Sequence, residues 1–481
     1  MRCRSHYCTF AIVTCLILYG CINLGPDYSR PDLGVDIPSE YEWTPEEPPP
    51  LEIEDRWWEI FGDRELNTLV DEVLKNNWDI KLAAARVLEA RAQYVRTRAD
   101  RFPAVDLSGL RDRRRVPSDL EDGIIVDTYE LAAPASFEVD LWGRLKKASQ
   151  AAWEDILQEE ETRRTVAQSI VAEAITLYLL IEEVERRLQI AEQSINAFRQ
   201  SLQFVETRYR RGLISVLDVR QASRTLAEAE ALVPQLEQEL GVTQQQLAVL
   251  LGRYPQTQAP RRQPVDYYKQ MEPVPPGLPS ELLQRRPDIR AAEARLRSLN
   301  EQVGVAKAAR FPSITLTGSY GWRSDDLSKF LRSENIAWNL SAGIVQPIFD
   351  AGRLKAGQRA AEARYQQEAA DYAQTVLDAF SEVERALLTR ERQLERRERE
   401  LKFLMEARAT QRVAQNRYIR GLVEYLDVLE AQITRFQAED RVVLVDFIIL
   451  SNRVALHRAL GGGWAEPQPV ENRDDGMFFQ F

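Results

Sequence analysis

The chain is poor in the residues that most enzyme centres require. Its 481 residues include only two histidines, His6 and His457, and all four cysteines lie within the first 21 residues. The rest of the chain therefore cannot form a Cys/His zinc site, a Cys–His nucleophile pair or a disulfide. His457 is the one histidine left for a catalytic triad, and no serine-containing elbow motif accompanies it. These shortages argue against most classes of enzyme.

The chain also lacks an excess of basic residues and, beyond its N-terminus, any long apolar run. Its 63 basic and 74 acidic side chains give a formal net charge of −11. This charge disfavours nucleic acid as the main partner, because phosphate binding needs a basic surface. The most apolar internal segment, residues 442–450, is interrupted by Asp446 and is too short for a transmembrane helix. If the chain crosses a membrane, it must do so with β-strands.

The N-terminus has the pattern of an export signal. Two arginines precede an apolar stretch at residues 7–20, which is too short to span a bilayer as a helix. The stretch runs into the sequence LYGC, which resembles a bacterial lipoprotein processing site. We therefore predict a signal peptide at residues 1–20, cleavage before Cys21 and acylation of the Cys21 thiol. The alternative is ordinary secretion with an unmodified cysteine.

Several motifs recur at a constant offset of 209 residues, which predicts two homologous halves at residues 64–252 and 280–461. A proline-rich linker at 253–279 joins the halves, an extended segment at 21–63 precedes them, and a tail at 462–481 follows. The recurring pairs are Asp79-Ile80 with Asp288-Ile289, Arg101-Phe102-Pro103 with Arg310-Phe311-Pro312, Gly143-Arg144 with Gly352-Arg353, Arg208-Tyr209 with Arg417-Tyr418, Leu217-Asp218-Val219 with Leu426-Asp427-Val428, and Leu251-Gly252 with Leu460-Gly461.

Each half has the same predicted order of helix, two strands, long helix, turn and returning helix. The long helices almost lack glycine and proline, and at 1.5 Å per residue each would reach roughly 100 Å. Both end at a glycine, which is an ordinary helix-ending signal. Their alanine-rich seams and charged faces favour coiled-coil packing. The predicted helices are 64–101, 144–211 and 215–251 in the first half, and 280–310, 353–420 and 424–460 in the second.

Four segments of about ten residues alternate between apolar and polar side chains, at 104–110, 128–142, 313–322 and 338–344. One apolar and one polar face, with aromatic residues near the ends, is what a lipid-facing barrel requires. A soluble sandwich has the same alternation but needs more strands. Since about eight strands make the smallest barrel, more than one chain must contribute. We expect Arg113-Arg114-Arg115 in the loop after the first strand, and Trp142, Trp322 and Trp338 at the membrane interfaces.

The motifs resemble those of TolC-like outer-membrane efflux lipoproteins, over nearly the whole chain from Cys21 to Trp464. The resemblance implies an α+β membrane protein, a homotrimer with a twelve-stranded transmembrane β-barrel continuous with a twelve-helix periplasmic α-barrel. It implies an exit duct in the outer membrane that conducts drugs, toxic compounds or metal ions without catalysis or cofactor. A periplasmic adaptor and an inner-membrane transporter of the RND type would be its partners. The motifs are Leu278-Pro279-Ser280, residues 282–293, residues 309–314, residues 137–144, residues 417–428 and residues 460–464.

The functional positions are then those that gate the duct. Asp218 and Asp427 follow the two hairpin turns, and in a symmetric oligomer each forms a ring of carboxylates that favours cations. The alternative is that each aspartate only stabilises the N-terminus of its own helix. The resemblance implies that Tyr418, Asp427 and Glu430 line or lock the periplasmic tip, with Tyr418 bound to Asp218 of the neighbouring hairpin. Val423 replaces an arginine that some relatives use in this lock.

The two hairpin turns are the predicted contacts with the adaptor. Their glycines are explained by a bare helix–turn–helix, but their leucines suit insertion into a groove of a partner. The predicted docking residues are Arg211, Gly212 and Leu213 in the first turn, and Arg420, Gly421 and Leu422 in the second. Two other functions stay open at this point. The exit duct of a type I protein-secretion system shares the fold, and a lipid-anchored periplasmic coiled-coil scaffold leaves only the strands unexplained.

Overall fold

The computed structural model describes residues 24–32, 34, 37–38, 40–43, 56–118, 121–257, 267–270 and 279–462. The predicted signal peptide, Cys21, most of the predicted linker and nearly all of the predicted tail lie outside the described residues. The chain divides into two compact units. The first comprises Met1–Gly34, Ala85–Glu161 and Ala291–Gln374, and the second comprises Val35–Ala84, Thr162–Arg290 and Thr375–Phe481.

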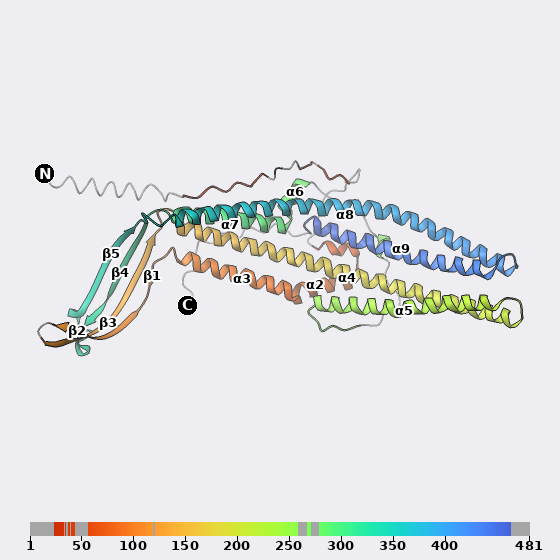
Figure 1. Ribbon diagram of the computed structural model, residues 1–481, viewed down its shortest axis with the longest axis horizontal. Helices are drawn as coiled ribbons and strands as arrows, with labels where there is room; N and C mark the ends of the chain where they lie inside the picture. Colours follow the sequence, from red (N-terminus) through yellow and green to blue (C-terminus); the bar gives the residue numbers. More distant parts are fainter. Residues whose placement is uncertain are drawn as a thin grey trace. The chain divides into compact units, whose positions relative to one another are not determined.

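The long helices have almost the bounds that the sequence predicts. Helix α4 is Arg144–Arg210 and helix α8 is Arg353–Ile419, each of 67 residues. The returning helices are α5, Val216–Leu250, and α9, Tyr425–Ala459, each of 35 residues. Figure 1 shows α4 turning back into α5 and α8 turning back into α9 at two similar hairpins. The corresponding helices begin 209 residues apart, so the sequence repeat is a repeat of structure.

The first helix of each half is interrupted, which the sequence analysis did not predict. Asn77 ends the earlier piece in the first half, and its side-chain oxygen accepts hydrogen bonds from the N–H groups of Asp79 and Ile80. It thus caps the helix that follows. In the second half Pro287 is the first residue of the later piece, where its missing N–H costs nothing. The four pieces are α2 (Arg64–Asn76), α3 (Trp78–Ala99), α6 (Pro279–Arg285) and α7 (Pro287–Ala308).

The strands of the first unit form one antiparallel sheet in the order β1-β3-β4-β5, with β2 also paired to β3. The two-residue strand β1 and the eleven-residue strand β2 together replace the predicted first strand. Gly318 of β4 lies opposite Ala135 of β3 on one side and Leu340 of β5 on the other. Every residue of β5, at the edge of the sheet, is exposed. The strands are β1 (Ala104–Val105), β2 (Ser108–Ser118), β3 (Glu121–Val139), β4 (Ser313–Ser324) and β5 (Ile336–Val345).

The arginine triplet is part of a strand, so its predicted place in a loop is wrong. Arg113, Arg114 and Arg115 lie in β2, and Arg113 is opposite Asp127 of β3. The guanidinium Nε of Arg113 is 3.7 Å from a carboxylate oxygen of Asp127. Opposite charges across an antiparallel pair are stabilising. The β2–β3 hairpin therefore extends beyond the region of apolar alternation, and this cross-strand pair of opposite charges lies in the extension.

The passage from strand β3 to helix α4 is anchored on the start of β4. The indole N–H of Trp142 donates a hydrogen bond of 2.7 Å to the carbonyl oxygen of Pro312. The Trp142 ring also packs against Phe311, with ring centroids 5.1 Å apart. The recurring motif Arg310-Phe311-Pro312 of the second half thus contacts the residue that precedes Gly143-Arg144 in the first half. This contact fixes where the second strand of the first half ends and the first strand of the second half begins.

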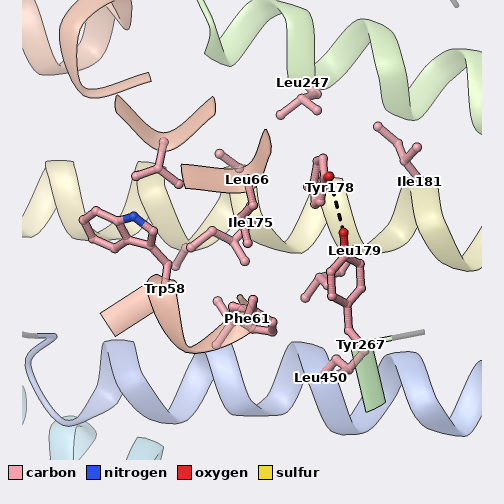
Figure 2. Close-up of a cluster of buried hydrophobic side chains, with 14 of the residues drawn as sticks. Trp58, Phe61, Leu66, Ile175, Tyr178, Leu179, Ile181, Leu247, Tyr267 and Leu450 are labelled. Atoms are coloured by element: carbon pink, nitrogen blue, oxygen red, sulfur yellow. Dashed lines mark hydrogen bonds between the residues drawn. The ribbon is translucent and has the colours of Figure 1, made fainter. Parts of the chain in front are cut away.

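The core of the second unit packs α4 against α2, α5, α9 and the short helices η1 (Trp57–Phe61) and η2 (Tyr267–Gln270). Leu66, Ile175 and Leu179 are almost fully buried there, as Figure 2 shows. A polar group lies inside this core. The Asp63 carboxylate accepts hydrogen bonds from the hydroxyl groups of Tyr178, at 2.8 Å, and Tyr267. It also caps α2, so one carboxylate joins three elements.

Helix α4 includes a stretch that is long and apolar enough to cross a membrane by length and composition, the one such helix among the described residues. However, 56% of that stretch is buried inside the chain. Because core residues such as Ile175 and Leu179 belong to α4, the helix has the apolar surface that a packed core needs. We therefore interpret α4 as a core helix.

Candidate functional site

The two hairpin turns have the same backbone hydrogen bonding. In the first, the N–H of Gly212 bonds to the carbonyl oxygen of Tyr209 at 2.8 Å, and the N–H of Leu213 bonds to that of Arg208 at 3.0 Å. The second turn repeats this pattern around Gly421, with both distances 2.9 Å. This pair of bonds is the Schellman motif. It needs the left-handed backbone that glycine adopts without strain, and φ is 71° and 74° at the two glycines.

The leucines of the turns are displayed rather than packed. Leu213 is 60% exposed and Leu422 is 61% exposed. Arg211 and Arg420 beside them are exposed as well. The Schellman motif accounts for the glycines, but it does not require large apolar side chains at the following position. All six predicted docking residues are therefore accessible in the chain, and their role in docking stays a prediction.

The two aspartates after the turns hold the starts of the returning helices. Asp218 accepts hydrogen bonds from the N–H and the hydroxyl of Ser215, at 3.0 and 3.1 Å. The Ser215 hydroxyl accepts in turn from the N–H of Leu217, which completes a capping box at the start of α5. Asp427 accepts from the N–H of Glu424 at 3.1 Å. Each aspartate therefore stabilises the N-terminus of its own helix, which was the alternative that the sequence left open.

Tyr418 is buried at the end of α8, where it joins α8 and α9 to α4. Its ring lies 5.7 Å from that of Tyr425 and 6.1 Å from that of Phe204. The guanidinium of Arg208 is 4.9 Å from the Tyr418 ring centroid, within cation–π distance. Among the described residues no hydrogen bond joins Tyr418 to Asp218. The predicted lock would therefore need a rearrangement within the hairpins or a second chain.

Both phenols of this cluster stay neutral near pH 7. Burial, assisted by the field of Asp218, raises the pKa of Tyr418 above its ordinary value, although Arg208 opposes the rise. Burial likewise raises the pKa of Tyr425 to about 12. The hydroxyl groups can therefore donate hydrogen bonds but carry no charge. The charge at this end of the helices comes from carboxylates, among them Asp218, Glu424, Asp427 and Glu430, and from the arginines.

Asp427 and Glu430 line a groove of about 710 Å³ between α8 and α9, next to the second turn. Arg417 lines the same groove, and so does Val423. A guanidinium therefore shares the groove with Asp427, although position 423 is a valine. The wall is otherwise formed by small or apolar residues and a few polar ones: Phe403, Glu406, Ala407, Ala409, Thr410, Val413, Ala414, Ala431 and Thr434.

The first unit holds a contact that the sequence analysis missed, between the N-terminal segment 24–32 and α7. Glu293 accepts hydrogen bonds from the guanidinium of Arg30, at 2.7 Å, and the hydroxyl of Tyr28, at 3.3 Å. Arg297, four residues on, also donates to it at 2.8 Å. Burial opposes ionisation, yet these two arginines hold the pKa of Glu293 below its ordinary value. The segment is thus bound to Glu293, the last residue of the motif at residues 282–293, here called the central motif.

His457, the one histidine that the sequence left for a catalytic triad, has a structural role. His457 is buried and its ring stacks on that of Trp57, with centroids 4.7 Å apart. Burial, and then the charge of Arg453, lowers the pKa of His457 to about 3, so the ring is neutral. Within the described ranges, no group of three or more His, Cys, Asp or Glu side chains is placed to hold a metal ion.

The chain thus combines long paired helices, exposed hairpin turns and a sheet with an open edge. The sequence model of the outer membrane efflux protein family matches residues 69–253 and again residues 278–462, an offset equal to the repeat period. The chain therefore belongs to the outer membrane efflux protein family. The cation efflux system protein CusC of Escherichia coli O6:H1 is 34% identical over 459 residues, covering 94% of this chain and 97% of CusC. The outer membrane protein OprJ of Pseudomonas aeruginosa is 35% identical over 472 residues, covering 95% and 96%.

Solved structures have the same fold. The outer-membrane channel OprN matches with a TM-score of 0.87 and 32% identity, covering 92% of this chain and 99% of that one. A CusC structure matches with a TM-score of 0.81 and 32% identity, covering 92% and 100%. These neighbours confirm the predicted fold class of trimeric outer-membrane channels with a periplasmic helical extension. The protein is an outer-membrane efflux component and a channel rather than an enzyme or a scaffold.

Proposed function

We propose that this chain is the exit duct of a tripartite pump, fed by a periplasmic adaptor protein and an inner-membrane transporter of the RND type. The observation that carries the proposal is the match to efflux channels over more than nine-tenths of the chain, with both hairpins retained. The exposed Leu213 and Leu422 support docking of the adaptor at the turns. A short apolar side chain on a rigid turn can enter a groove at little cost in conformational entropy.

We propose that the duct itself does not select the molecules that pass through it. One relative is named a cation efflux protein, and another, SrpC of Pseudomonas putida, is named a solvent efflux pump outer membrane protein. They are 34% and 33% identical to this chain, so similarity favours neither cargo. Metal ions and organic solvents have little binding chemistry in common. We infer a passive conduit for small molecules, whose selection lies with the pump.

The lipid anchor is tested by labelling. We expect cells that express the wild-type chain to incorporate radiolabelled palmitate into it, and cells that express Cys21→Ser to incorporate none. SilC of Salmonella typhimurium, 32% identical, is named a probable outer membrane lipoprotein, which supports the anchor. Cys15→Ser, inside the predicted signal peptide, is the matched control and should label like the wild type. Labelling that persists in Cys21→Ser would contradict the anchor.

We propose that Asp218, Tyr418, Asp427 and Glu430 form the gate at the periplasmic tip. Asp427 and Glu430 share a groove with Arg417, so an opposite charge can hold the carboxylates when the tip is shut. Tyr418 of α8 is packed against Tyr425 of α9 and Phe204 of α4, so it joins the second hairpin to the first. Movement of this hairpin would have to break the Tyr418 packing. A ring of three carboxylates from three chains would favour cations.

The gate is tested by single-channel recording from the purified protein in a planar bilayer. We expect small, cation-preferring openings for the wild type, weaker cation preference for Asp427→Asn, and more frequent openings for Tyr418→Phe. Asp427→Glu keeps the charge while disturbing the cap, so it separates the two roles of this carboxylate and should retain the preference. If both test substitutions behave like the wild type, the gate lies elsewhere.

A further inference from the structure

Glu183 of α4 is a buried acid for which the duct has no evident use. Its side chain is 3% exposed. One carboxylate oxygen is 3.4 Å from a guanidinium nitrogen of Arg187, one helical turn on, which is a long hydrogen bond. The other oxygen is buried and has no hydrogen-bond partner. An ionised carboxylate in this position would leave part of its charge without compensation, and that is costly in a protein interior.

Arg187 cannot fully compensate the charge of an ionised Glu183, because it also contacts two further carboxylates. Its Nε donates to Asp440 of α9 at 2.8 Å, and another of its nitrogens is 3.8 Å from Glu239 of α5. Three acids on three helices thus face one guanidinium, and full ionisation leaves two uncompensated negative charges. Asp440 and Glu239 are 31% and 41% exposed, so water can solvate them. Glu183 alone is shielded.

We propose that Glu183 is a proton-binding site that couples the packing of α4 against α5 and α9 to the pH of the surroundings. A bound proton removes one of the two uncompensated charges, and with it the cost of burying an ionised oxygen that accepts no hydrogen bond. Arg187 then remains for Asp440 and Glu239. A proton is the fitting ligand, because within the described part of the chain no cluster of acids is placed to hold a metal ion.

The surroundings of Glu183 favour its protonated form. Burial is the largest cause that raises its pKa, Glu239 and Asp440 add to the rise, and Arg187 opposes it. Together they raise the pKa of Glu183 from its ordinary 4.5 to about 7. The folded chain therefore holds the proton more tightly than the unfolded chain. The contribution of Glu183 to stability therefore falls as pH rises from about 4.5 to about 7 and then levels off.

The test compares thermal unfolding of the purified protein at pH 5.5 and pH 8. Glu183→Gln imitates the protonated acid. We expect this variant to melt above the wild type at pH 8, by on the order of a few degrees, and to match it at pH 5.5. Glu192→Gln, at an exposed position of the same helix, is the matched control and should follow the wild type. A variant that melts below the wild type at both pH values would show an ionised Glu183 and overturn the proposal.

Infrared difference spectra test the proton directly and do not depend on the stability of a variant. We expect the wild type to lose a protonated-carboxyl band between pH 5.5 and pH 8, and Glu183→Gln to lack that band. Asp440→Asn removes one competitor for Arg187, so the band should then disappear at lower pH. A wild-type protein without a pH-dependent band in this range would overturn the proposal. The exit-duct function would stand in that case, since it rests on none of these residues.

Discussion

Replacing Gly321 with alanine should prevent the sheet from forming, whereas the same change at Gly343 should be tolerated. Gly321 of β4 lies directly opposite Ala132 of β3. A methyl group on Gly321 would lie 2.6 Å from the Ala132 Cα and even closer to the carbonyl oxygen of Leu131. Both are backbone atoms, so neither can turn aside as a side chain does. Relief requires β3 and β4 to separate, which breaks the ladder between them.

The expected cost of Gly321→Ala is about 3 kcal/mol or more, the upper end for overpacking, because backbone must move. A methyl group on Gly343 of β5 would meet nothing nearer than the carbonyl oxygen of Thr315 at 3.9 Å, an ordinary contact. The measurement is the yield of folded oligomer in outer-membrane fractions. We expect most of it to be lost for Gly321→Ala and kept for Gly343→Ala. Equal yields would contradict the close approach of β3 and β4.

The helices could be predicted because their signals are local. Periodicity, the scarcity of glycine and proline, and the turn glycines Gly212 and Gly421 all act within a few residues of the feature that they define. The predicted bounds of α4 and α8 accordingly agree with the observed bounds to within one residue. The break at Asn77 was not predicted, because a capping asparagine inside an apolar-periodic stretch does not interrupt that periodicity. The break at Arg286 was not predicted either, although Pro287 is a local signal for it.

Contacts between distant residues could not be predicted from such patterns. Glu293 and Arg30 are 263 positions apart, and nothing near either residue in the sequence points to the other. The extension of β2 through three arginines depends on the register with β3, which only the folded hairpin sets. The same limit applies at the hairpins. The sequence allows two roles for Asp218 and Asp427, capping a helix or forming a ring of carboxylates. The structure of the single chain shows the capping role. A ring of carboxylates requires three chains.

Arg286 explains why the central motif has its particular residues. Its guanidinium is 9% exposed and lies at the break between α6 and α7. Two of its nitrogens donate to the carboxylate of Asp288, at 3.0 and 2.6 Å, in a fork geometry. The third donates to Glu382 of α8 at 2.8 Å and to the carbonyl oxygen of Ala459 at 3.0 Å. One side chain thus joins the start of α7, the side of α8 and the end of α9.

Arg286→Ala should therefore destabilise the second unit by about 3 kcal/mol, at the low end for breaking a buried ion pair because the partner acids are about one-third exposed. Arg286→Lys should recover only part of this, since an ammonium group cannot form the fork to Asp288. Arg285→Ala, at the exposed neighbouring position, is the matched control and should cost less than about 1 kcal/mol.

The readout that separates this role from a general loss of stability is amide hydrogen exchange at the end of α9. Ala459 loses a bonding partner in Arg286→Ala, so exchange at residues 456–462 should rise more than exchange in α5. A uniform rise would mean that Arg286 contributes only to overall stability. Unchanged exchange and unchanged melting would mean that the bonds of Gly461 and Gly462 hold the end of α9 without it. In either case the central motif would need another physical explanation than the junction of these three helices.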